Sequence, residues 1–383
     1  MQDHEYCQQE INTIYKYCWG ALIIALPPIS SKFDRFRSNP LQEVSMATVD
    51  NGLSLPEIKQ HKKPFFSLLN PYLYLIPAFL VMGVITYYPM FYQVWMSFTD
   101  YGLKNLRITA PAPNFVGLSN YINILTSKLG LSYFNFGHML AFNLWWTFSN
   151  VIIHVALGIM IAVILNRQGL WFKGIYRALF ILPIVLPQII VANIFKNMFD
   201  PDYGAFNQGL AILGKVFFNL GPDLFKIHWI DQVNYPISWL PLTLSYFALL
   251  ITNVWLGWPF MTIVASGALQ SIPKDLYEAA KIDGASEGQQ FWKITLPLIR
   301  PAMVPAAVYG LVMTFNLFSL IYFLSGGGPL RQTEILITAA YRLINEQRLY
   351  GVAAAFCVFI FFILLALTLI TNAITRATES YDV

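Results

Sequence analysis

One stretch of the chain nearly matches a phosphate-binding loop, the eight residues GLAILGKV from Gly209 to Val216. Such a loop needs the pattern G-x-x-x-x-G-K-[ST], because its last hydroxyl binds Mg²⁺ beside the phosphates. Val216 stands where that hydroxyl is required, so we do not expect nucleotide binding here. The three cysteines, Cys7, Cys18 and Cys357, have no metal-ligand or disulfide-framework spacing. With no nucleophile–base pair visible either, the sequence predicts that the chain is not itself an enzyme and holds no cofactor or metal.

Most of the charge in the second half of the apolar part of the chain lies in residues 277–297, YEAAKIDGASEGQQFWKITLP. Just before this stretch, Pro273 suits the first turn of a helix, because the N–H that proline lacks would be unpaired there. Asp275 and Glu278 follow where the helix dipole favours anions. Gly284 is expected to end this helix, since glycine adopts the left-handed backbone that closes one.

A second helix is expected to start directly after that glycine. Ser286 can act as its N-cap, with Gln289 at the capping-box position, and Pro297 marks the return to an apolar run. The stretch therefore predicts a helix, a tight turn and another helix. The adjacent alanines, Ala279 and Ala280, leave room for the surface of another protein to approach closely, although ordinary loop packing would give the same local pattern.

The elements that flank this stretch must be read from composition and hydropathy. The chain has 383 residues, of which 56% are hydrophobic and only 11% charged, and its mean hydropathy is +0.53. A soluble domain carries roughly 25% charged residues, so much of this surface must face something other than water. The net charge of +4 is too small to predict a nucleic acid partner.

Six apolar runs exceed the roughly 20 residues needed to cross a bilayer. Tyrosine and tryptophan crowd several run ends, as in YYPMFYQVW, which fits aromatic belts at the membrane interfaces. The fold predicted from these runs is an all-α membrane protein with six transmembrane helices. The runs lie near residues 72–97, 139–165, 178–199, 240–266, 302–324 and 351–374.

Lysine and arginine predict the orientation of these runs. With six spans, both termini lie on one side of the membrane together with the loops 166–177 and 267–300, and that side holds most of the basic residues. The positive-inside rule therefore predicts that both termini and the charged stretch are cytoplasmic.

The domain boundaries follow from the same runs. Residues 1–70 are predicted to be a flexible cytoplasmic extension, 71–375 the transmembrane domain that includes the loop 267–300, and 376–383 a cytoplasmic tail. The early run WGALIIALPPI is too short to span and lacks the basic segment and cleavage site of a signal peptide. One further hypothesis places the biological start at Met46, because residues before it have no visible role.

No Asp, Glu, Lys or Arg lies in the central part of any predicted span. Such residues are the usual mark of proton or sodium relays, so their absence argues against an ion-coupled secondary sugar transporter, which stays open as the alternative. An intramembrane enzyme would need a catalytic pair within the spans, and none is visible. The polar residues that do occur there are interpreted as interhelical contacts. They are His154, Asn143, Asn150, Gln188, Asn193, Asn253, Thr314 and Asn316.

The charged stretch resembles the EAA motif of permeases in ATP-binding-cassette importers, which reads E-A-A, then a glycine, then a distal I-x-L-P. Four shorter motifs are similar to the maltose-type carbohydrate branch: FVGLSNY at 115–121, DYGAFN at 202–207, WLGWPF at 255–260 and GGGP at 326–329. Their order and spacing make the resemblance specific over roughly residues 70–375. The EAA pattern falls on Glu278, Ala279, Ala280, Gly284, Ile294, Leu296 and Pro297.

This resemblance implies a permease subunit of the type I importer fold, in a bacterial inner membrane, whose cytoplasmic loop 267–300 carries a coupling helix. It implies a second, different permease as partner, two ATPase subunits that use ATP and Mg²⁺, and an extracytoplasmic solute-binding protein. The solute is expected to be a sugar or a sugar-like compound. The residues implied to contact an ATPase are Glu278, Ala279, Ala280, Asp283 and Gly284.

The resemblance also implies which residues line the substrate pathway, on the two spans that flank the charged loop. Where the maltose-type subunit has a tyrosine, an amide or a hydroxyl, this chain has Phe260, Leu317 and Gly310. Each lost hydrogen bond to a buried sugar hydroxyl typically costs about 1–3 kcal/mol, so the identity of the sugar is left open. The implied pathway residues are Leu256, Gly257, Phe260, Gly310, Met313, Thr314, Asn316 and Leu317.

Overall fold

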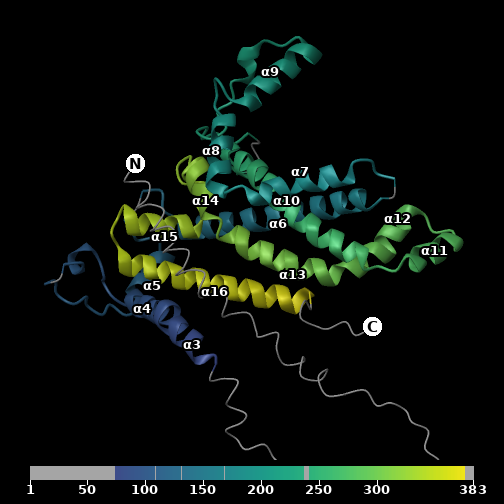
Figure 1. Cartoon of the computed structure of the whole chain (residues 1–383). Helices are drawn as coiled ribbons and strands as arrows, with labels where there is room; N and C mark the ends of the chain where they lie inside the picture. The colour runs from purple at the N-terminus through teal and green to yellow at the C-terminus, as the bar shows by residue number, and fades with distance from the viewer. Residues whose placement is uncertain (1–73, 108, 131, 168, 237–240, 376–383) are drawn as a thin grey trace, which may run out of the picture. The chain divides into compact units, whose positions relative to one another are not determined.

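The regular secondary structure in the described part of the computed structural model is helical, apart from one isolated β-bridge between Thr99 and Phe115 (Figure 1). The chain forms two compact units, residues 1–95 and 96–383. The expectations for residues 1–70, for Met46 and for the tail 376–383 fall outside the described residues. The structure describes residues 74–107, 109–130, 132–167, 169–236 and 241–375.

The first predicted run forms a helix in three consecutive pieces. These are α3 (Ile76–Met82), the π-helical turn η2 (Gly83–Tyr87) and α4 (Tyr88–Ser97). Within the first unit, most of its side chains are exposed and none of those in α3 or η2 is buried. An apolar helix with so little packing of its own needs lipid or another chain to cover it.

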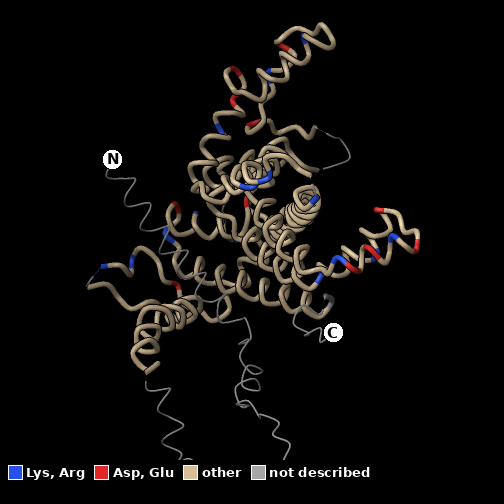
Figure 2. Tube along the Cα trace, turned by 45° about the vertical axis from the view of Figure 1, so that its right-hand side comes forward, with Lys and Arg blue, Asp and Glu red and all other residues tan. Residues whose placement is uncertain are grey.

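Four helical stretches are long and apolar enough to cross a membrane, and a bent pair of helices adds a possible fifth. Figure 2 shows that these helices are almost free of charged residues, which gather in loops and short helices. The described part thus forms a helical membrane protein with four to five such spans, fewer than the six runs predicted. The four stretches are Phe136–Asn166, Leu244–Gln270, Glu287–Phe315 and Tyr350–Ala373.

Three predicted runs become single long helices close to their expected ends. They are α6 (Phe136–Asn166), α10 (Leu244–Gln270) and α16 (Tyr350–Thr375). None of these three helices contains an Asp, Glu, Lys or Arg. The helical conformation satisfies the backbone hydrogen bonds within each segment, as a spanning segment requires, and the apolar side chains suit a lipid environment.

The third predicted run, 178–199, is divided into α7 (Lys173–Val185) and α8 (Gln188–Met198), which are bent by 97°. The bend falls at Leu186 and Pro187. Proline has no N–H to continue the helix, and it forces the residue before it into an extended backbone. Leu186 accordingly has φ −75° and ψ 132°.

The fifth predicted run, 302–324, also differs from its expected form. A helical path runs through α12 (Glu287–Gln290), the π-helical turn η5 (Phe291–Thr295) and α13 (Leu296–Phe315). It stops after Phe315 and resumes as α14 (Phe318–Leu320) and the π-helical turn η6 (Ile321–Ser325). The run thus begins earlier than predicted and breaks inside its predicted length, at a point where side chains of α6 bind the backbone.

The remaining short helices lie in the connections between the long ones. Phe199, directly after α8, stacks on Phe206 near the start of α9, with ring centroids 4.5 Å apart. In the second unit α15 packs against α16. These connecting elements are η3 (Leu103–Asn105), α5 (Ser119–Leu125), α9 (Ala205–Phe218), η4 (Pro222–Phe225), α11 (Lys274–Ile282) and α15 (Leu336–Asn345).

The core of the second unit is the packing of α6, α10 and α13 around one another. Small residues let the helix backbones approach, as is common where helices pack within membranes. At Gly158 of α6, a Cβ would lie 2.9 Å from the backbone carbonyl carbon of Met261 in α10. The cluster at this core contains Ile159, Ala162, Met261, Ala265, Leu269, Ile272, Ile299, Met303 and Ala306.

We expect Gly158→Ala to destabilise this packing by about 1–3 kcal/mol, because the added methyl group overpacks a helix contact. The clash involves backbone atoms of α10, so a rotamer change cannot relieve it. The measurement is the thermal unfolding midpoint of the protein in detergent. Gly267→Ala in α10 is the matched control, since no heavy atom lies within 4 Å of its added Cβ. Equal midpoints for the two variants would contradict the close-packing assignment.

Candidate functional site: a capped helical hairpin and the buried polar contacts beside it

The charged stretch forms the predicted hairpin, and its turn is closed by backbone hydrogen bonds. At the end of α11, Ala285 N donates to Ala280 O at 2.8 Å and Gly284 N donates to Lys281 O at 3.1 Å. This pair of bonds is the Schellman motif, which satisfies carbonyls at a helix end. Gly284 has φ +78°, a conformation that side-chain-bearing residues rarely adopt. The prediction that Gly284 ends the first helix is confirmed.

The second helix of the hairpin begins with the predicted capping box. Ser286 N donates to Gln289 Oε1 at 2.9 Å, and Gln289 N donates to Ser286 Oγ at 3.3 Å. Both bonds satisfy N–H groups that an uncapped helix start would leave unpaired. Because the end of α11 and the start of α12 are both capped, the hairpin has a defined shape before any partner binds.

The hairpin is fixed to the base of α13. The hydroxyls of Tyr277 in α11 and Thr295 in η5 share a hydrogen bond of 2.9 Å. The buried Gln290 donates through Nε2 to Ala285 O at 2.9 Å, which ties α12 to the turn. The Tyr277 ring also packs against the core shared by α6, α10 and α13. A displacement of the hairpin would therefore be passed to the start of α13.

The structure leaves the five predicted contact residues open to solvent to different degrees. Glu278, Ala279, Asp283 and Gly284 are exposed, and Ala280 is half-buried. The sequence reasoning did not single out Ile282, whose side chain is 87% exposed at the turn. In the sequence, Ile282 follows Ala279 by three residues, a spacing that places both on one side of a helix.

A surface ion pair joins the hairpin to the connection after α6. Arg167 Nη2 lies 3.4 Å from Glu287 Oε2, and both side chains are largely exposed. Such exposed pairs contribute little, because water and salt screen them. The pair orients α12 weakly, and the hydrogen bonds of Tyr277 and Gln290 hold the hairpin.

Several of the polar residues predicted within spans join α6 to α10. Asn253 Nδ2 donates to Asn150 Oδ1 at 2.7 Å, and His154 Nε2 donates to the backbone oxygen of Asn253 at 3.0 Å. Asn150 Nδ2 donates in turn to Trp146 O at 2.7 Å. These residues are buried. Their interpretation as interhelical contacts is confirmed for Asn150, His154 and Asn253, which use their polar groups on protein partners.

The three pathway candidates of α10 lie in one turn, and all are half-buried. A Cβ at Gly257 would collide with the imidazole ring of His154, so this glycine lets α6 and α10 approach. The ring of Phe260 lies 5.5 Å from that of Tyr309 in α13, measured between centroids. Leu256 and Phe260 leave aromatic and aliphatic surface available for the apolar face of a ligand.

The five pathway candidates on and after α13 surround the helix break. A Cβ at Gly310 would lie 2.7 Å from Met261 Cε, so Gly310 faces α10. Thr314, Asn316 and Leu317 are buried and Met313 is half-buried. Within the described part of the chain, Asn316 Oδ1 has no hydrogen-bond partner although it is buried. A buried acceptor without a partner is costly and is a candidate for ligand binding.

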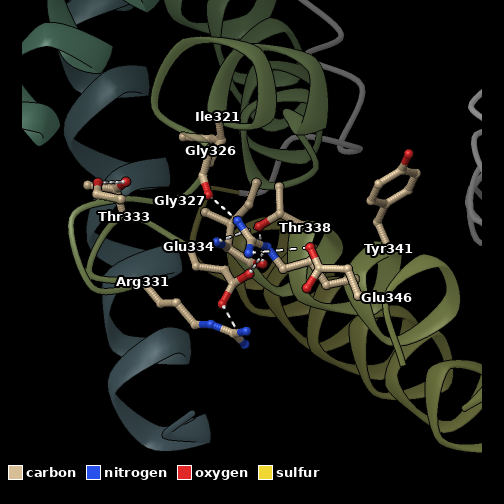
Figure 3. Close-up of polar contacts among 12 residues, drawn as sticks. Ile321, Gly326, Gly327, Arg331, Thr333, Glu334, Thr338, Tyr341 and Glu346 are labelled. Atoms are coloured by element: carbon tan, nitrogen blue, oxygen red, sulfur yellow. Dashed lines mark hydrogen bonds and ion pairs between the residues drawn. The ribbon is translucent and has the colours of Figure 1, made fainter. Parts of the chain in front are cut away.

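A buried ion-pair cluster follows the GGGP motif, and the sequence reasoning missed it. The Glu334 side chain is fully buried, and its Oε1 lies 2.8 Å from Arg342 Nε (Figure 3). Arg331 Nη1 lies 3.8 Å from Glu334 Oε2, and Arg342 Nη1 lies 3.6 Å from Glu346 Oε1. Arg342 Nη2 also donates to Gly326 O. Two guanidinium groups thus compensate one buried carboxylate and tie the glycine turn to α15.

The environment of Glu334 shifts its acidity. Burial raises the pKa of Glu334, while the guanidinium groups of Arg342 and Arg331 oppose that shift. The turn approaches the carboxylate closely, since a Cβ at Gly327 would lie 3.2 Å from Glu334 Cβ. In the sequence, this cluster was indicated only by the charged residues of the segment between two apolar runs. These residues are Arg331, Glu334, Arg342 and Glu346.

Neither the hairpin nor these buried contacts form a centre for covalent chemistry. Among the described residues, no group of three or more His, Cys, Asp or Glu side chains could hold a metal ion. What the arrangement offers is a capped, exposed hairpin joined to a long apolar helix, together with uncharged side chains around the break that follows that helix.

Comparison with protein families places this chain close to known transport proteins. The family described as "Binding-protein-dependent transport system inner membrane component" matches residues 154–380. The galactooligosaccharides transport system permease protein of Bacillus subtilis is 32% identical over 342 residues, covering 87% of this chain and 75% of the relative. The trehalose/maltose transport system permease protein of Thermococcus litoralis is 32% identical over 306 residues, covering 80% and 93%.

A solved structure supports the fold assignment. A chain of a bacterial ABC transporter involved in the import of the acidic polysaccharide alginate matches with a TM-score of 0.65. The match covers 83% of the present chain and 100% of the solved one, at 21% sequence identity. The resemblance at that identity is one of fold.

We expect Glu334→Leu to cost roughly 3–5 kcal/mol, because it leaves Arg342 and Arg331 without the carboxylate that compensates them. The readout is the thermal unfolding midpoint in detergent, with hydrogen exchange of α15 as the local measure. Glu346→Gln is the matched control on the same Arg342, and its 48% exposed side chain predicts a change below about 1 kcal/mol. Similar decreases in the unfolding midpoint of the two variants would show that the burial of Glu334 does not determine its contribution to stability.

Proposed function

Because this chain belongs to the family of binding-protein-dependent transport system inner membrane components, it is a permease subunit of an ATP-driven sugar importer, and we propose that it carries a neutral oligosaccharide. It forms half of the translocation pathway, and a second, different permease subunit forms the other half. ATP is hydrolysed in two separate ATPase subunits with Mg²⁺, and a solute-binding protein delivers the sugar from outside.

The hairpin α11–α12 is the contact with one ATPase subunit in this proposal. Glu278, Asp283 and the small residues Ala279, Ala280 and Gly284 form its contact surface. The observation that carries the assignment is an exposed hairpin whose two helix ends are both capped and whose base is bonded to α13. A coupling element must have two properties, an open surface for the partner and a firm connection to the part that moves.

The proposed membrane arrangement has six spans within residues 71–375. The helix 76–97 is the first span, the bent pair α7–α8 is the third, and the fifth continues through the break after Phe315. Both termini and the hairpin face the cytoplasm, since most basic residues lie on that side.

The chemistry of the pathway candidates favours a neutral solute. None of the eight residues carries a charge. An acidic sugar chain needs a cation to replace its solvation within a membrane-spanning path, and arginine or lysine usually supplies it. Thr314 and Asn316 offer polar contacts to sugar hydroxyls, and Phe260 offers a surface on which the apolar face of a sugar can stack.

An ion-coupled secondary transporter is the alternative that the sequence left open. It would need ionisable groups at mid-membrane and would work as a single chain. The helices α6, α10 and α16 contain no Asp, Glu, Lys or Arg. Purification in mild detergent separates the two functions, because recovery of a lone active carrier without an ATPase would contradict the importer.

We expect Gly284→Ala to weaken ATPase binding about fivefold, because the left-handed backbone costs a residue with a Cβ about 1 kcal/mol. No heavy atom lies within 4 Å of a Cβ at Gly284, so the change tests the turn alone. The measurement is the affinity of the purified ATPase for the permease pair in nanodiscs. Gly288→Ala in α12 is the control, since its added Cβ is equally free and its φ is not positive. Unchanged binding by Gly284→Ala would reject the coupling assignment.

In proteoliposomes that hold the whole importer, we expect ATP-dependent uptake of neutral malto- or galactooligosaccharides and none of an alginate trisaccharide. The physical reason is the uncharged set of pathway residues. Radiolabelled sugars, supplied with the cognate binding protein, give the measurement. Accumulation of the acidic trisaccharide alone would refute the neutral-sugar assignment while leaving the importer function intact.

A further inference from the structure

The break after Phe315 creates a problem that the protein must solve. A helix end leaves its last carbonyl groups without partners inside the helix. Here the end is Phe315, the last residue of the stretch Glu287–Phe315, and both Thr314 and Phe315 are buried, so a carbonyl group left unpaired there is costly. Thr314 O accepts locally from Leu317 N at 3.2 Å and can take a second bond, while Phe315 O needs a partner from elsewhere in the protein.

Two buried side chains of α6 supply those partners. Asn143 Nδ2 donates to Phe315 O at 3.1 Å, and Trp146 Nε1 donates to Thr314 O at 3.2 Å. Asn143 and Trp146 are both 0% exposed. They lie three residues apart, on one face of α6, as the helical repeat requires. The end of α13 is thus capped from a different helix.

The same asparagine also binds the start of another helix. Asn143 Oδ1 accepts a hydrogen bond from Leu336 N, the first residue of α15, at 3.0 Å. One amide therefore uses its donor on the end of α13 and its acceptor on the beginning of α15. These two segments are separated by the break and by the glycine turn, so no continuous helix connects them.

The start of α15 is held in place on its other sides as well. Thr338 Oγ1 donates to Ile335 O at 2.8 Å and accepts from Ile335 N at 3.0 Å. The residue before Ile335 is Glu334, whose buried carboxylate is paired with Arg342 of α15. These bonds connect the residues from Glu334 to Arg342 to one another. A group that binds Leu336 therefore holds the whole of α15.

On the other side, Phe315 is joined to the hairpin by an unbroken helical stretch, Glu287–Phe315. A helix of this length moves as a nearly rigid body over distances of a few ångström. Displacement of the hairpin would reach Phe315, and beyond the break it could proceed only through side-chain contacts.

We propose that Asn143 is a positioning residue that couples α13 to α15, so that movement of the hairpin reaches the segment between Glu334 and Arg342. This inference rests on the proposed coupling function of the hairpin. Asparagine suits the position because its side-chain amide has both a donor and an acceptor. Leucine offers neither, although its side chain has the same branched shape.

The test uses the complete importer in nanodiscs, with Cys7, Cys18 and Cys357 replaced and spin labels attached at exposed positions. One pair of labels, at Ile152 of α6 and Leu298 of α13, reports on α13 before the break. A second variant carries labels at Ile152 and at Gln347, directly after α15. Pulsed electron paramagnetic resonance measures both distances without nucleotide and with ATP and vanadate.

In the otherwise native protein we expect both distances to change with ATP and vanadate. In Asn143→Leu we expect the change for the first pair to persist and the change for the second pair to be lost. Trp146→Phe is the matched control, because it removes a hydrogen bond to the same helix end but none to α15. It should retain both changes. Asn143→Gln, which keeps the amide, should restore part of the second change.

Three results would overturn the proposal. The second distance could still change in Asn143→Leu, both distances could become insensitive in that variant, or Trp146→Phe could lose the second change as well. A merely structural role predicts the last two results, since both variants weaken the same helix end. If neither distance responds in the native protein, the coupling function of the hairpin fails too, which separates the two hypotheses.

Discussion

The constraint on which this structure depends is that backbone groups within a membrane-spanning bundle must be paired inside the protein. Long helices meet it by themselves, and every departure from a long helix needs an outside partner. The side chains of α6 supply several of these partners. Asn143 and Trp146 bind the end of α13, while Asn150 and His154 bind α10. α6 is consequently the helix against which the two spans flanking the hairpin are positioned.

This arrangement separates regions of different mechanical character. α6 and α10 are packed so closely that glycines at Gly158 and Gly257 are required for their contact. The hairpin, in contrast, is exposed and bound to the bundle through Tyr277 and its neighbours at the base of α13. The bend between α7 and α8 and the break after Phe315 interrupt two of the other predicted runs. Motion driven by a partner can therefore occur where helices are interrupted while the α6–α10 pair stays intact.

The hairpin was predictable in detail because its determinants are local. Gly284, Ser286 and Gln289 act within a few residues of themselves, and each took the predicted role. The long helices α6, α10 and α16 were also predictable, since apolar length alone specifies a spanning helix. The break in the fifth run was not, because the polar residues at that point, Thr314, Asn316 and Ser319, are of types that also occur inside the unbroken helices α6 and α10.

The sequence by itself determined the class of the protein, the positions of most long helices and the capped hairpin. The tertiary structure alone decided where two of the predicted runs are interrupted and how the buried charge of Glu334 is compensated. It also decided which polar groups meet across helices. Asn143 shows the reason most clearly, because its partners Phe315 and Leu336 lie 172 and 193 residues away along the chain. Local sequence patterns extend over a few helical turns, so contacts at such separations depend on how the whole bundle packs.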